Sequence, residues 1–356
     1  MPTGARRPLA GSLGRLLRAA TTPLVPADFL DLVAPLSSAH DLRARVLAVH
    51  AETDIATTVV LRPGRGWKGH VPGQYLRLGV DVDGVRLWRA YSLTSAPRWG
   101  HLTITVKAMP DGRVSNHVRD ALRPGAIVHL DQASGDFTLD RRHPGSTGSL
   151  FLVGGSGVTP AIGILRSHLD ELDDVTVIHC ARTPEDALFA EELGELASTG
   201  AIRLVEHHSE ESGQLDLATL DVLCPDWQER HTWACGPTGL LDAAEQHWAE
   251  HRASRRLTTE RFRPALAAVG EGGTVHFRDT EVEAGGGHTI LDAAEDAGVL
   301  MPSGCRMGIC FGCVLPLTDG AVRDLRSGEL TNAEPGDRIS VQTCVSAAAG
   351  ACSFDH

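Results

Sequence analysis

The chain has 356 residues, a formal net charge of −12 and 42% hydrophobic residues. This length predicts two or three domains, each large enough to bury its own core. The acidic balance argues against a nucleic-acid partner, and no apolar run reaches the roughly eighteen residues that a membrane-spanning helix needs.

Residues 1–41 are expected to form an N-terminal helical extension. A short basic amphipathic stretch lies within it, made of Leu9, Leu13, Leu16 and Leu17 with Arg15 and Arg18. Such a stretch either packs on its own domain, which we favour, or contacts a membrane or a membrane-embedded partner. No continuous apolar segment follows Arg6 and Arg7, so no secretory signal is expected. We expect a cytoplasmic protein, with peripheral attachment to the inner membrane face as the alternative.

Residues 42–145 contain short strand-like runs separated by Pro/Gly turns, at 44–49, 57–61, 75–80 and 102–106. This pattern predicts a small antiparallel β-barrel. The stretches 89–94 and 106–115 add an arginine, a tyrosine and hydroxyl groups, which suit a phosphate and a planar ring with a polar edge. Taken alone, each stretch also fits an ordinary barrel surface.

Residues 146–250 alternate buried strands with helices, which predicts a parallel α/β domain. The strand at 149–153 runs into Gly154-Gly-Ser-Gly-Val-Thr-Pro160, with Thr159 expected as the N-cap and Pro160 in the first turn of a helix over 161–169. A glycine turn at a helix N-terminus binds pyrophosphate through close backbone approach and the helix dipole. Further strands are expected at 175–179 and 202–205, and helices at 185–196 and 239–250.

Cys235 ends the last expected strand of this domain, where a parallel sheet opens its ligand crevice. Residues 251–271, rich in arginine, alanine and glycine, are interpreted as an interdomain linker. Residues 272–356 read as an α+β unit with strands near 274–278 and 281–283 and a helix over 289–297. They hold twelve acidic residues against five arginines, a surface that favours either solubility or docking of a basic redox partner.

Four cysteines in this last segment have the spacing C-x4-C-x2-C followed by a distant fourth: Cys305, Cys310, Cys313 and Cys344. This is the spacing of plant-type [2Fe–2S] ligands, and the glycines of the loop allow it to wrap an inorganic core. Structural zinc is the alternative, but zinc modules usually show two matched cysteine pairs. The pattern therefore predicts a one-electron redox carrier.

In combination, these motifs resemble the ferredoxin–NADP+ reductase superfamily, in the form that carries a plant-type ferredoxin at its C-terminus. The resemblance covers about residues 42–356 and rests on Arg89-x-Tyr91-Ser92, Gly112-x-x-Ser115, the glycine turn, Cys235-Gly-Pro237 and the cysteine loop. It implies a flavin-binding β-barrel, an NAD(P)-binding α/β domain and a β-grasp ferredoxin domain. The chain looks most like actinobacterial reductases of acyl-CoA desaturases and diiron oxygenases, partly through its extension at 24–33.

The resemblance also implies roles for individual residues. Arg89 would bind the flavin phosphate, Tyr91 would pack on the isoalloxazine ring and Ser92 would hydrogen-bond near N5. The remaining cofactor residues would be Lys107, Gly112 and Ser115 on the flavin pyrophosphate side, and Gly154, Gly155, Gly157, Thr159, Gly236 and Pro237 around the nicotinamide nucleotide. Cys235 would lie by the nicotinamide C4 as a positioning group, with a merely buried small residue as the alternative.

Several alternatives remain open in the sequence. Arg182 follows a strand and is placed to pair with an NADPH 2′-phosphate, yet the segment 207–211 is acidic. FAD is expected, although an FMN-using subgroup shares the same domain order. The expected acceptor is a separate oxygenase or fatty-acyl desaturase. A ring-hydroxylating dioxygenase and a non-catalytic metal-binding interaction protein are the alternatives.

Overall fold

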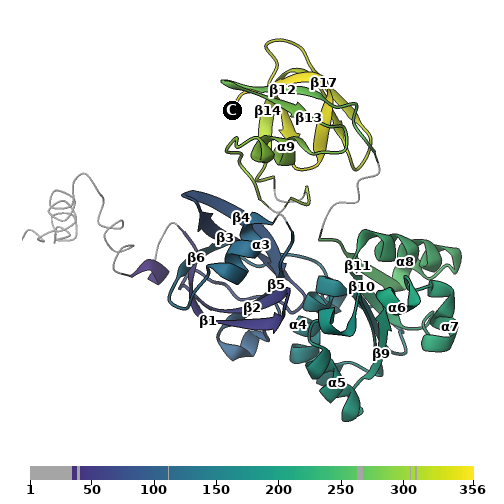
Figure 1. The fold of residues 1–356 in the computed structure, drawn as a ribbon. Helices are drawn as coiled ribbons and strands as arrows, with labels where there is room; N and C mark the ends of the chain where they lie inside the picture. The colour runs from purple at the N-terminus through teal and green to yellow at the C-terminus, as the bar shows by residue number, and fades with distance from the viewer. Residues whose placement is uncertain (1–33, 38–40, 111, 263–267, 305, 309–310) are drawn as a thin grey trace, which may run out of the picture.

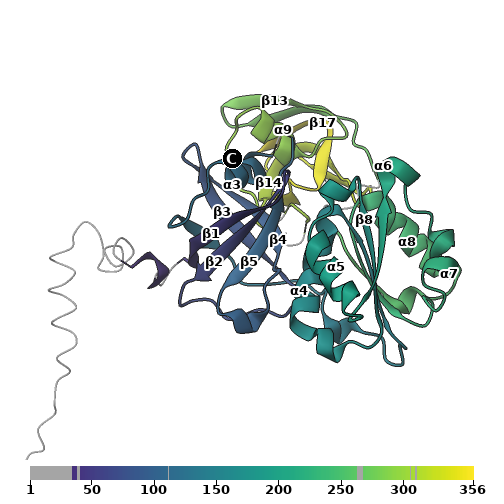
Figure 2. The same cartoon turned by 60° about the horizontal axis from the view of Figure 1, so that its bottom comes forward.

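A computed structural model describes residues 34–37, 41–110, 112–262, 268–304, 306–308 and 311–356. The amphipathic stretch at 9–18, most of the expected N-terminal extension, Cys305 and Cys310 lie outside the described residues. No helix in the described ranges combines the length and the apolar character that a bilayer crossing needs. Figures 1 and 2 show three sheet-containing domains that follow one another along the chain.

The first domain is the predicted antiparallel barrel. Its strands follow the order β4-β3-β6-β1-β2-β5 and an isolated bridge between Leu93 and Ile104 connects the end of β4 to β5. Buried residues from all six strands fill its interior. The strands are β1 Arg43–Thr53, β2 Ala56–Pro63, β3 Tyr75–Val82, β4 Val85–Ser92, β5 Leu102–Lys107 and β6 Ile127–Leu130, with helix α3 at Arg113–Asp120.

The second domain is the predicted parallel sheet, with the strand order β11-β10-β7-β8-β9. Helices α4 and α5 pack on one face, around Phe151 and Trp233, and α7 and α8 pack on the other, around Trp227 and Trp248. The strands are β7 Ser149–Gly154, β8 Val175–Ala181, β9 Arg203–His208, β10 His231–Cys235 and β11 Leu257–Glu260; the helices are α4 Val158–His168, α5 Ala190–Ser198, α6 Ser209–Ser212, α7 Leu220–Leu223 and α8 Thr238–Glu250.

The interpretation of 251–271 as a linker is wrong for part of this segment. Residues Leu257–Glu260 form β11, which pairs in parallel with β10 and places Glu260 opposite Cys235. Because the strand is only four residues long and mostly polar, it lacks the apolar run that marks the other strands of the sheet. The nucleotide-domain sheet therefore ends at β11, beyond the expected boundary at residue 250.

Two helix starts also differ from the prediction. Helix α4 begins at Val158, so Thr159 lies in its first turn and donates a hydrogen bond to the Ser156 carbonyl (2.8 Å) instead of capping the helix. The helix expected from residue 185 divides into a 3₁₀ turn at Pro184–Asp186 and α5, because Phe189 adopts a left-handed conformation (φ 58°) between them. Both shifts leave the glycine turn in its predicted place.

The third domain is a mixed sheet of order β13-β12-β17-β14-β15, with β16 paired to β14. Helix α9 covers it, and its core includes Val275, Ile290 and Phe354. In Figure 1 α9 lies on the side of this domain that is nearest to the barrel. Its elements are β12 Gly273–Phe277, β13 Thr280–Ala284, α9 Ile290–Asp296, β14 Val314–Asp324, β15 Leu330–Ala333, β16 Ile339–Gln342 and β17 Ser346–Phe354.

Candidate active site

The predicted flavin residues lie together at the end of β4. Arg89 and Tyr91 are two residues apart on the strand and therefore share a face; both are half-buried. Arg89 donates to the Trp88 carbonyl (2.8 Å). Ser92 is 3% exposed, and its buried hydroxyl has no hydrogen-bond partner in the described part of the chain. A buried hydroxyl without a partner costs free energy unless a ligand satisfies it, so Ser92 fits a residue that meets a polar ring atom.

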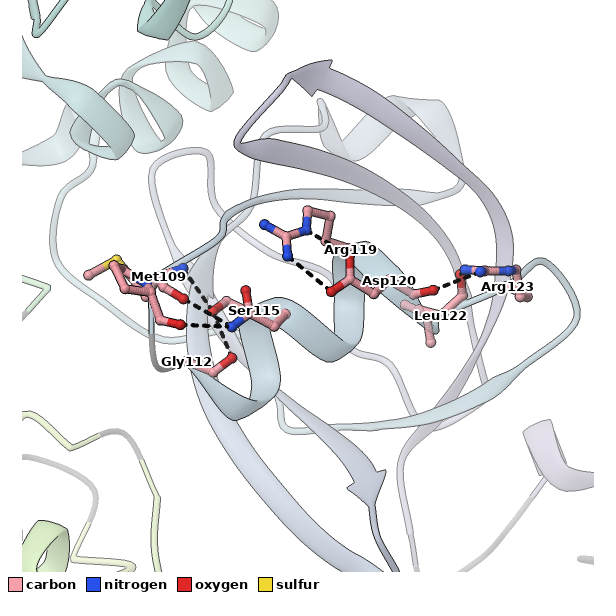
Figure 3. A network of polar contacts seen from close by, with 9 residues as sticks. Met109, Gly112, Ser115, Arg119, Asp120, Leu122 and Arg123 are labelled. Atoms are coloured by element: carbon pink, nitrogen blue, oxygen red, sulfur yellow. Dashed lines mark hydrogen bonds and ion pairs between the residues drawn. The ribbon is translucent and has the colours of Figure 1, made fainter. Parts of the chain in front are cut away.

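Lys107 is the last residue of β5. Gly112 and Ser115 lie at the start of α3 (Figure 3). The Ser115 hydroxyl accepts from the Met109 backbone N–H (3.2 Å) and donates to the Gly112 carbonyl (3.2 Å). A Cβ at Gly112 would overlap this hydroxyl. Ser115 therefore stabilises the loop before α3. Because its hydroxyl is engaged within that loop, we expect the loop, and not the Ser115 side chain, to make the predicted contact with the cofactor.

The glycine turn after β7 packs directly against the turn after β10. A Cβ on Gly157 would overlap the Cys235 carbonyl, and one on Gly154 would lie 2.8 Å from Pro237 Cδ. Gly236 is also packed tightly against this turn, because a Cβ added to it would lie 3.0 Å from the Gly154 nitrogen. Gly155 adopts φ 53°, which favours glycine. The structure thus brings together the residues predicted to border the nicotinamide nucleotide, in two turns that pack too closely to admit side chains at these three glycines.

Cys235 itself is fully buried, in the core between the sheet and α4. Burial raises the pKa of its thiol well above the usual range, and the neighbouring Glu260 carboxylate raises it further. The thiol is therefore neutral at ordinary pH and unsuited to act as a nucleophile. This agrees with a positioning role, and its contact with the nicotinamide stays a prediction.

Glu260 is a site residue that the sequence reasoning missed. Burial raises its pKa to about 8, and its buried oxygen Oε2 has no hydrogen-bond partner among the described residues. Gly135 of the barrel lies between Glu260 and the Tyr75 ring: a Cβ there would be 3.0 Å from Tyr75 and 3.7 Å from Glu260 Oε1. Tyr75 is opposite Ser92 in the β3–β4 pair. Glu260, Cys235 and Ser92 therefore border one region where the two domains meet.

Arg182 follows β8, at the same edge of the sheet as the glycine turn. Its side chain is 69% exposed and forms an ion pair with Asp186 (2.9 Å). Glu210 is close enough to act on it electrostatically. The guanidinium is accessible to a ligand phosphate, but such a ligand would share it with these carboxylates.

The two described cluster cysteines, Cys313 and Cys344, are both nearly buried. A hydrogen bond with Cys344 lowers the pKa of the Cys313 thiol, so the two side chains lie within hydrogen-bond reach of each other. Thr343 fixes this arrangement, because its backbone N–H and its hydroxyl both donate to the Cys313 carbonyl (3.3 and 2.8 Å). Two thiols held together in this way fit adjacent ligands of a metal cluster.

The cluster loop lies close to the flavin strand. Arg306, in this loop, forms ion pairs with Asp292 (2.6 Å) and Glu295, both on α9. Burial, together with the smaller effect of the Arg306 charge, lowers the pKa of Arg89 to about 10. Arg89 and Arg306 belong to different domains, so this coupling places the predicted flavin phosphate site and the predicted cluster within electrostatic reach of each other.

Family models match the three domains in order. They describe an oxidoreductase FAD-binding domain over residues 64–139, an oxidoreductase NAD-binding domain over 151–246 and a 2Fe-2S iron-sulfur cluster binding domain over 274–349. These matches favour the redox cofactors over the zinc and the non-catalytic alternatives.

Whole-chain comparisons agree. An NADPH oxidoreductase of Mycobacterium tuberculosis is 44% identical over 361 residues, which cover 98% of this chain and 93% of the relative. The ferredoxin reductase component of a 3-ketosteroid-9-alpha-monooxygenase from Mycolicibacterium smegmatis is 31% identical over 81% of this chain and 89% of its own length. The solved structure of phthalate dioxygenase reductase covers 89% of this chain and 98% of that one with a TM-score of 0.61, at 23% identity, and so shares the fold.

Proposed function

Because the chain belongs to the ferredoxin–NADP+ reductase superfamily, in the form with a C-terminal [2Fe–2S] domain, we propose that it carries electrons from NADPH to a separate oxygenase or acyl desaturase. It is an NAD(P)H-dependent oxidoreductase that uses a flavin and an iron–sulfur cluster. The electron acceptor, the coenzyme preference and the roles of single residues are the proposed part.

When bound, a flavin would supply hydride acceptance from the reduced nicotinamide, and a [2Fe–2S] cluster would supply one-electron transfer. This chain's residues provide the binding and the orientation for that chemistry. Ser92 offers a buried hydroxyl to the edge of the ring, and Tyr91 offers its aromatic face. The packed turns at Gly154, Gly157 and Gly236 would border the nicotinamide nucleotide, with the neutral, buried Cys235 thiol beside them.

The observation that carries this proposal is the order of three matched domains in one chain: FAD-binding, NAD-binding and 2Fe-2S cluster-binding. The buried Ser92 hydroxyl without a described partner supports a ring-binding site at the end of β4. The ion pairs of Arg306 with Asp292 and Glu295 fix the described part of the cluster loop on α9.

We propose NADPH as the preferred coenzyme, with Arg182 as the residue that recognises the 2′-phosphate. Arginine pairs with phosphate through a rigid fork of donors. Arg182 is exposed at the ligand edge of the sheet, and the 44%-identical relative is an NADPH oxidoreductase. FAD is proposed over FMN, because the matching barrel model is that of an FAD-binding domain.

The proposed acceptor is a separate protein that receives electrons at the ferredoxin domain. Two lines support it: a relative of this chain serves a monooxygenase, and the acidic excess of residues 272–356 suits a basic docking face. The narrower proposal of a fatty-acyl desaturase rests on the resemblance of the whole chain to actinobacterial reductases. Turnover with such a partner should fall as ionic strength rises.

The cluster's place as the exit point is tested with two artificial acceptors. Cys344→Ser should abolish NADPH-dependent reduction of cytochrome c, a one-electron acceptor, while ferricyanide reduction directly from the flavin persists. Cys352→Ser is the matched control, because Cys352 is an equally buried thiol of the same domain outside the motif. If Cys344→Ser lost cytochrome c reduction and ferricyanide reduction to the same extent, or retained both, the proposed order of transfer would be contradicted.

A further inference from the structure

A charged hydrogen-bond network stabilises the cluster loop. Its central residue is Arg326, which lies just after β14. The Arg326 guanidinium donates to the Gly308 carbonyl (3.1 Å) and to Gln342 Oε1 (3.1 Å). Gln342 donates in turn to the same Gly308 carbonyl (2.9 Å). One carbonyl of the cluster loop is therefore held by two side chains from distant parts of the domain.

Gly308 is shaped for this contact. It adopts φ 72°, a conformation that L side chains rarely take. A Cβ at this position would overlap Arg326 Nη1 and lie 3.0 Å from Val345 Cγ1. The guanidinium packs directly on the Gly308 backbone, so the position of Arg326 and the path of the loop depend on each other.

Arg326 is itself fixed by Asp324. Its Nε and Nη2 donate to the two carboxylate oxygens (3.1 and 2.6 Å), and its backbone N–H donates to Oδ1 (2.8 Å). The Arg326 side chain is 35% exposed. Its partners Gly308 and Gln342 each lie two residues before a cluster cysteine in the chain, Cys310 and Cys344, which places this cation beside the cluster ligands.

We propose that Arg326 is a positioning residue that fixes the cluster loop through Gly308 and raises the reduction potential of the cluster. Reduction would add one electron, and therefore one negative charge, to the cluster. A permanent cation nearby would stabilise that charge. Asp324 opposes the electrostatic effect while it holds the guanidinium in place.

The test uses three variants of the full-length, cofactor-loaded protein. Arg326→Gln should lower the midpoint potential by at least the 59 mV that equals a tenfold change for one electron, and should speed iron loss to a chelator severalfold. Asp324→Asn keeps the turn and the arginine but removes the opposing charge, so it should raise the potential. Arg323→Gln is the control, because Arg323 lies only three residues earlier, on β14, but pairs with Glu271 and the Gly328 carbonyl.

Midpoint potentials are measured by dye-mediated titration followed by electron paramagnetic resonance of the reduced cluster. Arg326→Gln and Asp324→Asn shifts of opposite sign, with Arg323→Gln unchanged, would support the proposal. If Arg326→Gln retains its flavin but loses its cluster, the positioning role is supported and Asp324→Asn decides the electrostatic one. Potentials and iron-loss rates equal to those of Arg323→Gln in both variants would overturn the proposal.

Discussion

Glu260 and Cys235 lie opposite each other on the parallel strands β11 and β10, with the Cys235 thiol fully buried and the Glu260 carboxyl raised in pKa to about 8. The pair borders the turn that packs on Gly157. A neutral thiol and a carboxyl that titrates near neutrality make this corner uncharged over most of the acidic range. It is therefore suited to an uncharged ring face, such as that of reduced nicotinamide.

Glu260 should make the stability of the folded chain depend on pH. Its pKa is about 8 in the folded state against 4.5 unfolded, so between these values the folded state holds a proton that the unfolded state has released. Stability should then fall as pH rises from about 4.5 to about 8 and level off above. Glu260→Gln should remove this loss and melt above the parent at pH 8.5, with little difference at pH 5. An identical offset of melting temperature at both pH values would contradict the assignment.

Ser92→Ala should slow hydride transfer while the cluster stays intact. The loss of one hydrogen bond to the ring is expected to reduce single-turnover flavin reduction by about tenfold, equivalent to about 1.4 kcal/mol. Stopped-flow absorbance under anaerobic conditions measures it. Ser149→Ala is the matched control, because Ser149 also has a buried hydroxyl without a described partner but begins β7, at the far end from the glycine turn. Equal rates in the two variants would refute the role of Ser92.

Gly157→Ala should damage the nucleotide site by sterics alone. Its Cβ would overlap the Cys235 carbonyl, and overpacking of this kind costs about 1–3 kcal/mol of stability. The variant should melt lower and bind reduced nicotinamide coenzyme weakly. Gly194→Ala, on the open side of α5 with no atom within 4 Å, should instead gain up to about 1 kcal/mol. A Gly157→Ala protein with parental melting temperature and coenzyme affinity would show that the two turns are not in contact.

Arg182→Ala should discriminate between the two coenzymes. The loss of a phosphate-pairing guanidinium is expected to raise KM for NADPH about tenfold and to leave KM for NADH unchanged, since NADH lacks the 2′-phosphate. Arg203→Ala provides the control, because Arg203 is an exposed arginine at the opposite end of the same sheet. A proportional change of both KM values, or no change in either, would remove Arg182 from the coenzyme site.

Much of the site could be predicted because its signals are local in sequence. The turn at Gly154–Gly157 follows an apolar strand directly, and the cysteine spacing is read without any tertiary information. Strand β11 was not predicted because Leu257–Glu260 is short and polar. Its place in the sheet is determined by its pairing with β10. Thr159 was expected as an N-cap, but α4 starts earlier and uses its hydroxyl within the first turn.

The residues that connect distant segments could not be found by pattern. In the sequence, Arg326 is one of five arginines in its domain and is not distinguished from the others. The fold brings it to Gly308, which lies eighteen residues earlier in the chain. Arg306 acts electrostatically on Arg89 only because the fold brings the cluster loop within reach of β4. Electrostatic and packing relationships of this kind depend on tertiary structure, whereas phosphate turns and metal ligands depend on local spacing.

The central claim, a chain of electron carriers that starts from NADPH, is tested most directly by anaerobic absorbance titration of the purified protein with NADPH and, separately, with NADH. The account predicts flavin bands on a broad iron–sulfur envelope, both of which bleach on addition of coenzyme, with NADPH effective at the lower concentration. A colourless, zinc-containing protein that does not respond to either coenzyme would contradict it.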